Sequence, residues 1–160
     1  MEQVRICCFT GHRNVYNAAT VIARLRRQVR RLAEQGCRTF RAGGAIGFDM
    51  LAALCVLEIR QEFGLRLELY LPCRNQADRW SAHDKSFYYH ILKCADSVEY
   101  VSEAYTYSCM YDRNRRMVDG ADVCVAYLTQ STGGTAYTVN YANKKNVKVI
   151  NLAQNGGASI

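Results

Sequence analysis

Short apolar segments of strand character alternate with helical segments along almost the whole chain of 160 residues. Their composition predicts strands over residues 4–9, 38–42, 66–71, 97–101, 121–128 and 147–152. Helices are predicted from Asn17, as N-cap, to a stop at Gly36, and over residues 48–63, 83–94, 109–119 and 136–145. Repeated units of this kind predict an α/β fold, Rossmann-like and doubly wound, with a mainly parallel sheet and helices on both faces.

The length and composition place this pattern in one globular unit. We expect a single domain over residues 1–153 and a flexible C-terminal tail over residues 154–160. No run of about 18 apolar residues occurs, and the first residues lack the regions of a signal peptide, so we expect no membrane contact. Eight cysteines are scattered without a Cys-x-x-Cys pair, and the chain has three histidines. We therefore expect buried free thiols, no metal site, no cofactor and a cytoplasmic protein.

The formal net charge of +7 is concentrated in one predicted helix. Between residues 17 and 36, a single acid, Glu34, accompanies five arginines: Arg24, Arg26, Arg27, Arg30 and Arg31. A solvated outer helix face explains such a run, and a surface for a phosphate backbone or an acidic partner is the alternative. Because aromatic residues are not interleaved with these arginines, we rank nucleic acid last among the partners.

Two glycine-rich turns follow predicted strands and precede predicted helices. Backbone N–H groups at such a helix start are free to bind an anion, and the helix dipole favours it. Two turns of this kind predict a site for a phosphorylated ligand, a nucleotide or a relative of one. The candidate ligand-binding residues of the turns are Gly43, Gly44, Ala45, Gly47, Phe48, Asp49, Ser131, Gly133, Gly134 and Thr135.

Other loops that follow strands are expected at the same edge of the sheet, where ligands of doubly wound folds bind. The loop Thr10-Gly11-His12-Arg13 offers a hydroxyl, an imidazole and a guanidinium. His12 is either an acid, base or polarising group, or a surface or capping residue. Asp49 either caps its helix or accepts a hydrogen bond from a ribose or base. Arg113 is placed to reach a phosphate, and Trp80 either stacks on a nucleobase or folds over the core.

Several motifs in order resemble the YpsA-like bacterial family of the SLOG superfamily. They are residues 9–13, 43–49, 76–80, 113–119 and 131–138, and the resemblance runs from about residue 4 to 152. It implies a nucleotide or nucleotide-sugar pocket at the glycine turns. Relatives in the superfamily are the LOG phosphoribohydrolases, whose association implies a homodimer, and the DNA-processing protein DprA.

The LOG enzymes cleave the base from a nucleoside monophosphate with an arginine and a glutamate. Their arginine motif matches Met110 to Arg113, whereas Tyr137 stands where the glutamate would be. Arg113 and Asp49 are therefore the candidate catalytic pair. Three functions remain open at this point: a nucleotide-derivative sensor or regulator, a nucleotide N-glycosidase, and a single-stranded nucleic-acid binder.

Overall fold

The computed structural model describes residues 3–153, and the predicted tail at 154–160 lies outside the described residues. Six strands form one sheet in the order β4-β3-β2-β1-β5-β6, and every neighbouring pair is parallel. The α/β, doubly wound prediction is thus confirmed. In chain order the elements are β1 (Ile6–Gly11), α1 (Ala18–Glu34), β2 (Thr39–Ala42), α2 (Phe48–Phe63), β3 (Arg66–Cys73), α3 (Ala82–Cys94), β4 (Ser97–Ser102), α4 (Cys109–Val118), β5 (Val123–Tyr127), α5 (Gly134–Lys144) and β6 (Lys148–Asn151).

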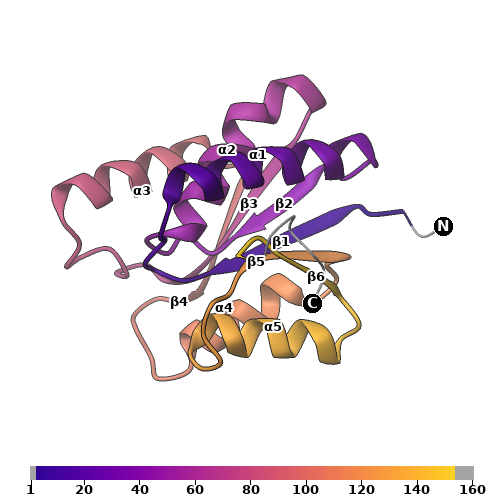
Figure 1. Ribbon diagram of the computed structural model, residues 1–160. Coiled ribbons are helices and arrows are strands. Elements are labelled where there is room, and N and C mark those ends of the chain that lie inside the picture. The colour runs from indigo at the N-terminus through magenta and orange to yellow at the C-terminus, as the bar shows by residue number, and fades with distance from the viewer. Residues whose placement is uncertain (1–2, 154–160) are drawn as a thin grey trace.

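The helices form two layers on opposite faces of the sheet, α1, α2 and α3 on one and α4 and α5 on the other (Figure 1). The chain first moves outward from β1 to β4, then crosses back so that β5 pairs with the free side of β1. The loops after β1 and β5 therefore lead to opposite faces. This reversal is the topological switch point of the sheet, where doubly wound folds bind ligands.

The sheet buries apolar side chains on both faces because helices cover both. Cys7 and Cys8 are adjacent in β1, and their side chains belong to different core clusters, as the alternation along a strand predicts. On the face of α1 and α2, Phe9 stacks on Phe40 with ring centroids 5.9 Å apart. Every residue of β5 is buried, which explains its continuous apolar sequence.

Two local features differ from the prediction. Asn17 occupies the N-cap position of α1, but its φ of 54° is left-handed and its side chain makes no capping hydrogen bond. The third strand continues through Pro72 to Cys73, instead of ending before the proline. Its pairing with β2 ends at Leu69, and its pairing with β4 runs through Leu71 and Cys73 on either side of Pro72, so the strand continues although the proline has no N–H to donate.

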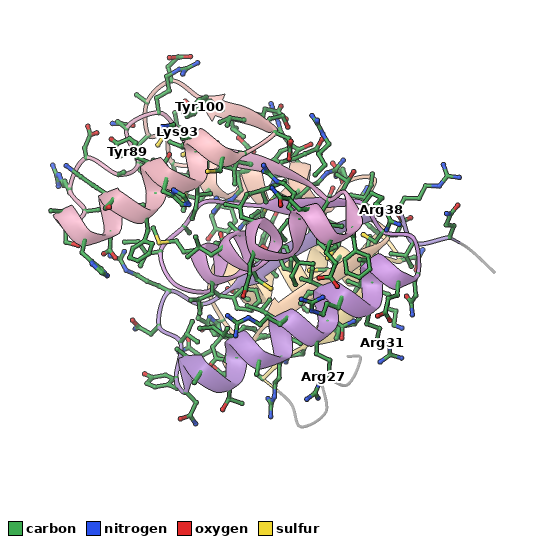
Figure 2. All side chains as sticks on the ribbon, turned by 90° about the horizontal axis from the view of Figure 1, so that it is seen from above. Arg27, Arg31, Arg38, Tyr89, Lys93 and Tyr100 are labelled. Carbon is green, nitrogen blue, oxygen red and sulfur yellow. The ribbon has the colours of Figure 1, made fainter. Side chains whose placement is uncertain are left out.

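The basic helix α1 is partly neutralised within the fold. Arg26 Nε lies 2.9 Å from Glu58 of α2, and Arg30 pairs with Glu62 one turn further on. Arg27 and Arg31 project away from this seam (Figure 2). The two ion pairs support the interpretation of α1 as an outer, solvated helix.

No helix within residues 3–153 is long and apolar enough to cross a membrane. The same residues contain no cluster of three or more potential metal-ligating side chains. All eight cysteines are free thiols, and all but Cys94 are buried.

Candidate functional site

A cleft of about 550 Å³ lies at the carboxyl ends of the strands, above the switch point. Its volume is in the range of small-molecule sites. Loops after five strands, β1 to β5, contribute to its lining, so the expected gathering of loops occurs. The candidate residues that line it are Thr10, Gly11, His12, Arg13, Ala45, Asp49, Trp80, Arg113, Gly134 and Thr135.

Two oppositely charged side chains, Asp49 and Arg113, are buried at the floor of the cleft. They are 5% and 4% exposed. Asp49 accepts a hydrogen bond from the Ala45 N–H at 3.3 Å. Arg113 donates through Nη1 to the Gly43 carbonyl, and through Nε to Asn114 Oδ1 at 2.7 Å. Both side chains thus reach the cleft while they also hold the first glycine turn.

Gly43 is required by these two side chains. A Cβ at this position would lie 2.6 Å from Arg113 Nη1 and 2.7 Å from Asp49 Oδ2. Any larger residue would push the charged pair apart. Gly43 therefore shapes the floor without lining the cleft.

Burial dominates the electrostatics of this pair. It raises the pKa of Asp49 to about 6, although the Arg113 charge and the Ala45 N–H act in the opposite direction. Burial likewise lowers the pKa of Arg113, and Asp49 opposes that shift. The floor of the cleft consequently holds a carboxyl group whose pKa lies above the usual range for aspartate.

His12 links the loops on the two sides of the switch point. Its Nε2 accepts a hydrogen bond from the Thr129 N–H at 2.9 Å, and its ring meets Tyr127 edge-on at 5.9 Å. Burial lowers its pKa, which favours the neutral imidazole. With Nε2 accepting, the proton of that neutral ring is on Nδ1, where it is a donor. His12 therefore has a structural contact and also lines the cleft.

The second glycine turn opens directly into α5, which begins at Gly134, two residues before its predicted start. Gly133 has a φ of 100°, a conformation that favours glycine. Gly134 and Thr135 line the cleft, and they belong to the helix turn whose N–H groups have no acceptor within the helix. A Cβ on Gly134 would meet nothing nearer than Asn114 Nδ2 at 4.0 Å.

The other candidate residues lie outside the cleft lining. Phe48 is fully buried, stacks on Tyr127 at 6.0 Å, and donates its N–H to the His12 carbonyl at 3.2 Å. It supports the cleft from below, so the expectation of a direct ligand contact does not fit its position. The remaining residues outside the lining are Gly43, Gly44, Gly47, Ser131 and Gly133.

Two of these glycines allow close approaches beneath the cleft. Gly44 has a φ of 68°, and a Cβ there would lie 2.4 Å from the Leu71 side chain. Gly47 has a φ of 93°, and a Cβ there would lie 2.1 Å from the Arg13 carbonyl oxygen. The glycines let the first two loops pack against each other and against the core.

Several lining residues were not among the candidates. Gln76 bonds the Gly44 carbonyl through Nε2 at 3.3 Å. Asn114 accepts a hydrogen bond from Arg113 Nε. Its position directly after Arg113 in the sequence was the only feature that could have identified it as a lining residue. Trp80 folds over the core, where its ring packs edge-on against Tyr88 at 5.1 Å, and it also lines the cleft, so its stacking on a nucleobase stays a prediction. The other unpredicted lining residues are Ile46, Cys73, Tyr105, Tyr107, Met110, Tyr111 and Met117.

Tyr137, which stands in the place of the LOG glutamate, is engaged elsewhere. Its hydroxyl accepts a hydrogen bond from Arg115 Nη1 at 2.7 Å, and its ring meets Tyr111 edge-on at 4.7 Å. Among the described residues that line the cleft, Asp49 is the one carboxylate. Any carboxylate chemistry in this cleft would therefore fall to Asp49.

Known proteins resemble the chain in both sequence and fold. The uncharacterized SPbeta prophage-derived protein YoqJ of Bacillus subtilis (strain 168) is 30% identical over 118 residues, which cover 66% of this chain and 69% of that protein. A UPF0398 protein of Bacillus thuringiensis (strain Al Hakam) is 28% identical over 125 residues, 76% of this chain and 68% of the relative.

Two solved structures of DNA processing protein A have a similar fold. The Helicobacter pylori structure, described for its single-stranded DNA binding mode, has a TM-score of 0.71 at 17% identity and covers 98% of this chain and 69% of its own. The Streptococcus pneumoniae protein has a TM-score of 0.65 at 15% identity, over 91% of this chain and 49% of its own. The YpsA family model, described as the YspA SLOG family, matches residues 3–153. The chain therefore belongs to the YspA SLOG family.

Proposed function

We propose that the cleft binds a nucleotide derivative and that the protein acts as a sensor or regulator of that ligand. One observation carries the proposal: a cleft at the switch point combines the first turn of α5 with the buried pair Asp49 and Arg113. A helix start favours a phosphate, whereas a buried carboxylate favours a neutral hydrogen-bond donor such as a sugar hydroxyl.

Two groups of lining residues suit two parts of such a ligand. The phosphate is assigned to the N–H groups of Gly134 and Thr135, which line the cleft at the start of α5. The sugar is assigned to Asp49, because its charge is offset by Arg113 and so repels a neighbouring phosphate less. Arg113 already donates to Gly43 and Asn114, so we assign it a positioning role as well as a ligand contact.

Substitution of Gly134 tests the phosphate assignment. Gly134→Asp places a carboxylate where the phosphate is expected, and its Cβ would meet nothing nearer than Asn114 Nδ2 at 4.0 Å. We expect nucleoside monophosphate binding, measured by calorimetry and thermal shift, to be lost in a folded protein. Gly134→Ala is the matched control, since it adds bulk without charge and should weaken binding much less. Unchanged affinity in folded Gly134→Asp would remove α5 from the site.

Hydrolysis of an N-glycosidic bond is a second candidate function, favoured by the position of Asp49, the one carboxylate among the described residues that line the cleft. An ionised Asp49 would stabilise the positive charge that develops on the sugar as the base leaves. The test is release of free base from nucleoside monophosphates by the wild type and by Asp49→Asn. Release that persists in Asp49→Asn would rule out this role for Asp49.

Single-stranded DNA is a further candidate ligand, since DNA processing protein A from Helicobacter pylori binds it and has a similar fold. The pairing of Arg26 and Arg30 with Glu58 and Glu62 reduces the free positive charge on α1. We therefore rank this function behind a small ligand. It predicts affinity for oligonucleotides that falls steeply as salt is raised, and binding without that dependence would contradict it.

A further inference from the structure

Three exposed tyrosines stand at the mouth of the cleft, and we name them the tyrosine rim: Tyr105, Tyr107 and Tyr111. They come from the β4–α4 connection and the first turn of α4, and they expose 66%, 93% and 40% of their surfaces. All three line the cleft. Aromatic side chains bury large apolar areas in most folds, so three exposed rings within seven residues need an explanation other than packing.

The burial of the lining residues divides the cleft into two zones. The charged groups Asp49 and Arg113 are almost fully buried and form the floor. The tyrosine rim is exposed and forms the mouth, and half-buried Trp80 lines the cleft from the β3–α3 connection. The exposed aromatic rings of the cleft are thus distinct from its buried charged groups.

One ring of the rim is held in place. Tyr111 meets Tyr137 of α5 edge-on at 4.7 Å, and the Tyr137 hydroxyl is fixed by Arg115. The rim therefore adjoins α5, at whose start the phosphate is assigned. Tyr107, at 93% exposure, is by contrast almost without contacts within the described chain and is available to a ligand.

We propose that the tyrosine rim binds the planar base of a nucleotide by stacking, with the base at the mouth and the sugar above Asp49. This inference rests on the proposed function and narrows it: the ligand is a nucleotide with its base attached, rather than a sugar phosphate. Aromatic stacking tolerates different bases because each has a π-face, so the rim predicts weak discrimination among them.

The test compares ligands with and without a base. Calorimetry measures the affinities of the four common nucleoside 5′-monophosphates and of ribose 5-phosphate for the wild type and for Tyr105→Ser/Tyr107→Ser. We expect the double variant to lose about tenfold in affinity for the nucleotides, the usual scale of one lost stacking contact. Its affinity for ribose 5-phosphate should equal that of the wild type.

Two further variants separate stacking from other causes. Tyr89→Ser is the matched control, because Tyr89 is also an exposed tyrosine, at 56%, but lies on α3 outside the cleft lining (Figure 2). It should bind all probes as the wild type does. Tyr105→Phe/Tyr107→Phe keeps both rings and should retain nucleotide affinity, whereas a loss there would assign the effect to the hydroxyls and overturn stacking.

The outcomes distinguish the rim from the proposed function. Equal nucleotide affinities of the wild type and the serine double variant would overturn the proposal that the tyrosine rim stacks on the base, and would leave the proposed function standing. An equal loss for nucleotides and ribose 5-phosphate would also overturn it, because the base would not be what the rim recognises. If the wild type binds none of these probes, the proposed function fails and the rim fails with it.

Discussion

Burial of the Asp49 side chain makes the folding stability of the protein depend on pH between about 4 and 6. Burial raises the pKa of Asp49 from 3.8 to about 6, in spite of the nearby Arg113. Between these two values the folded state holds a proton on Asp49 that the unfolded state has released. The contribution of this group to folding stability is therefore present below about pH 4 and is lost as pH rises to about 6.

Asp49→Asn should reveal this effect as a difference between two proteins, because the other carboxyl groups are common to both. We expect the stability of the variant relative to the wild type to increase from pH 4 to pH 6, by about 3 kcal/mol at most. Urea unfolding at several pH values measures it. A difference that does not change with pH would mean that the carboxyl of Asp49 titrates normally.

The start of α2 depends on a backbone contact between two loops. Gly47 is the N-cap residue of α2, has a φ of 93°, and packs under the Arg13 carbonyl of the β1–α1 loop. Gly64, at the other end of the same helix, also has a positive φ, of 69°, but a Cβ there would meet nothing within 4 Å. Gly64 is left-handed helical, with a ψ of 46°, whereas the ψ of Gly47 is −125°, so Gly47 combines a rarer backbone conformation with a close contact.

Alanine substitution at both ends of α2 uses this contrast. Gly64→Ala should cost about 1 kcal/mol, the strain of a left-handed residue. Gly47→Ala should cost about 3 kcal/mol or more, because alanine disfavours this backbone conformation more strongly and the new methyl group also collides with the Arg13 backbone. Denaturant unfolding compares the two. Equal losses of unfolding free energy in the two variants would show that the loop containing Arg13 moves aside easily. The neighbouring His12, which lines the cleft, would then not be held rigidly.

The helices and strands were largely predictable from the sequence, whereas the set of residues that line the cleft was not. Strands and helices follow from apolar periodicity and turn residues, and the predicted order appears in the structure. The path of a loop does not follow from its residues. Phe48 lies within a glycine-rich motif yet is buried in the core. Tyr107 lies between the strand predicted at 97–101 and the helix predicted at 109–119, in no motif, yet it lines the cleft. Only the sheet order, with β5 beside β1, decides which loops meet.

The cysteines sample most of the described molecule, and seven of the eight are buried. They lie in β1, β3 and β5, in α2 and α4, and before β2, while the partly exposed Cys94 ends α3. Burial also raises the pKa of Cys37 and Cys55 to about 12, so these thiols are poorly reactive in the folded state. The reactivity of the buried thiols therefore reports on the unfolding of all parts of the described chain that contain them.

We expect a thiol reagent to modify one cysteine, Cys94, quickly in the native protein, and Cys94→Ser to remove that reaction. The other seven should become reactive together in a single denaturant transition, because one cooperative unit exposes them at once. Mass spectrometry of the modified protein counts them. Groups of thiols that react at different denaturant concentrations would contradict the prediction of a single domain. A fast thiol left in Cys94→Ser would point to Cys73, which lines the cleft.

The position of β1 between β2 and β5 has a consequence for the growing chain on the ribosome. Domains fold as they emerge, N-terminal parts first. One edge of β1 can pair with β2 early in synthesis, whereas the other edge can pair only after β5 (Val123–Tyr127) has been synthesised. The cleft can form only after Gly134 has been added. Throughout that interval an apolar strand keeps an unpaired edge, the kind of surface that chaperones protect and that aggregates otherwise. If the proposed function is right, a ligand of the cleft would stabilise the chain only after synthesis has passed Gly134.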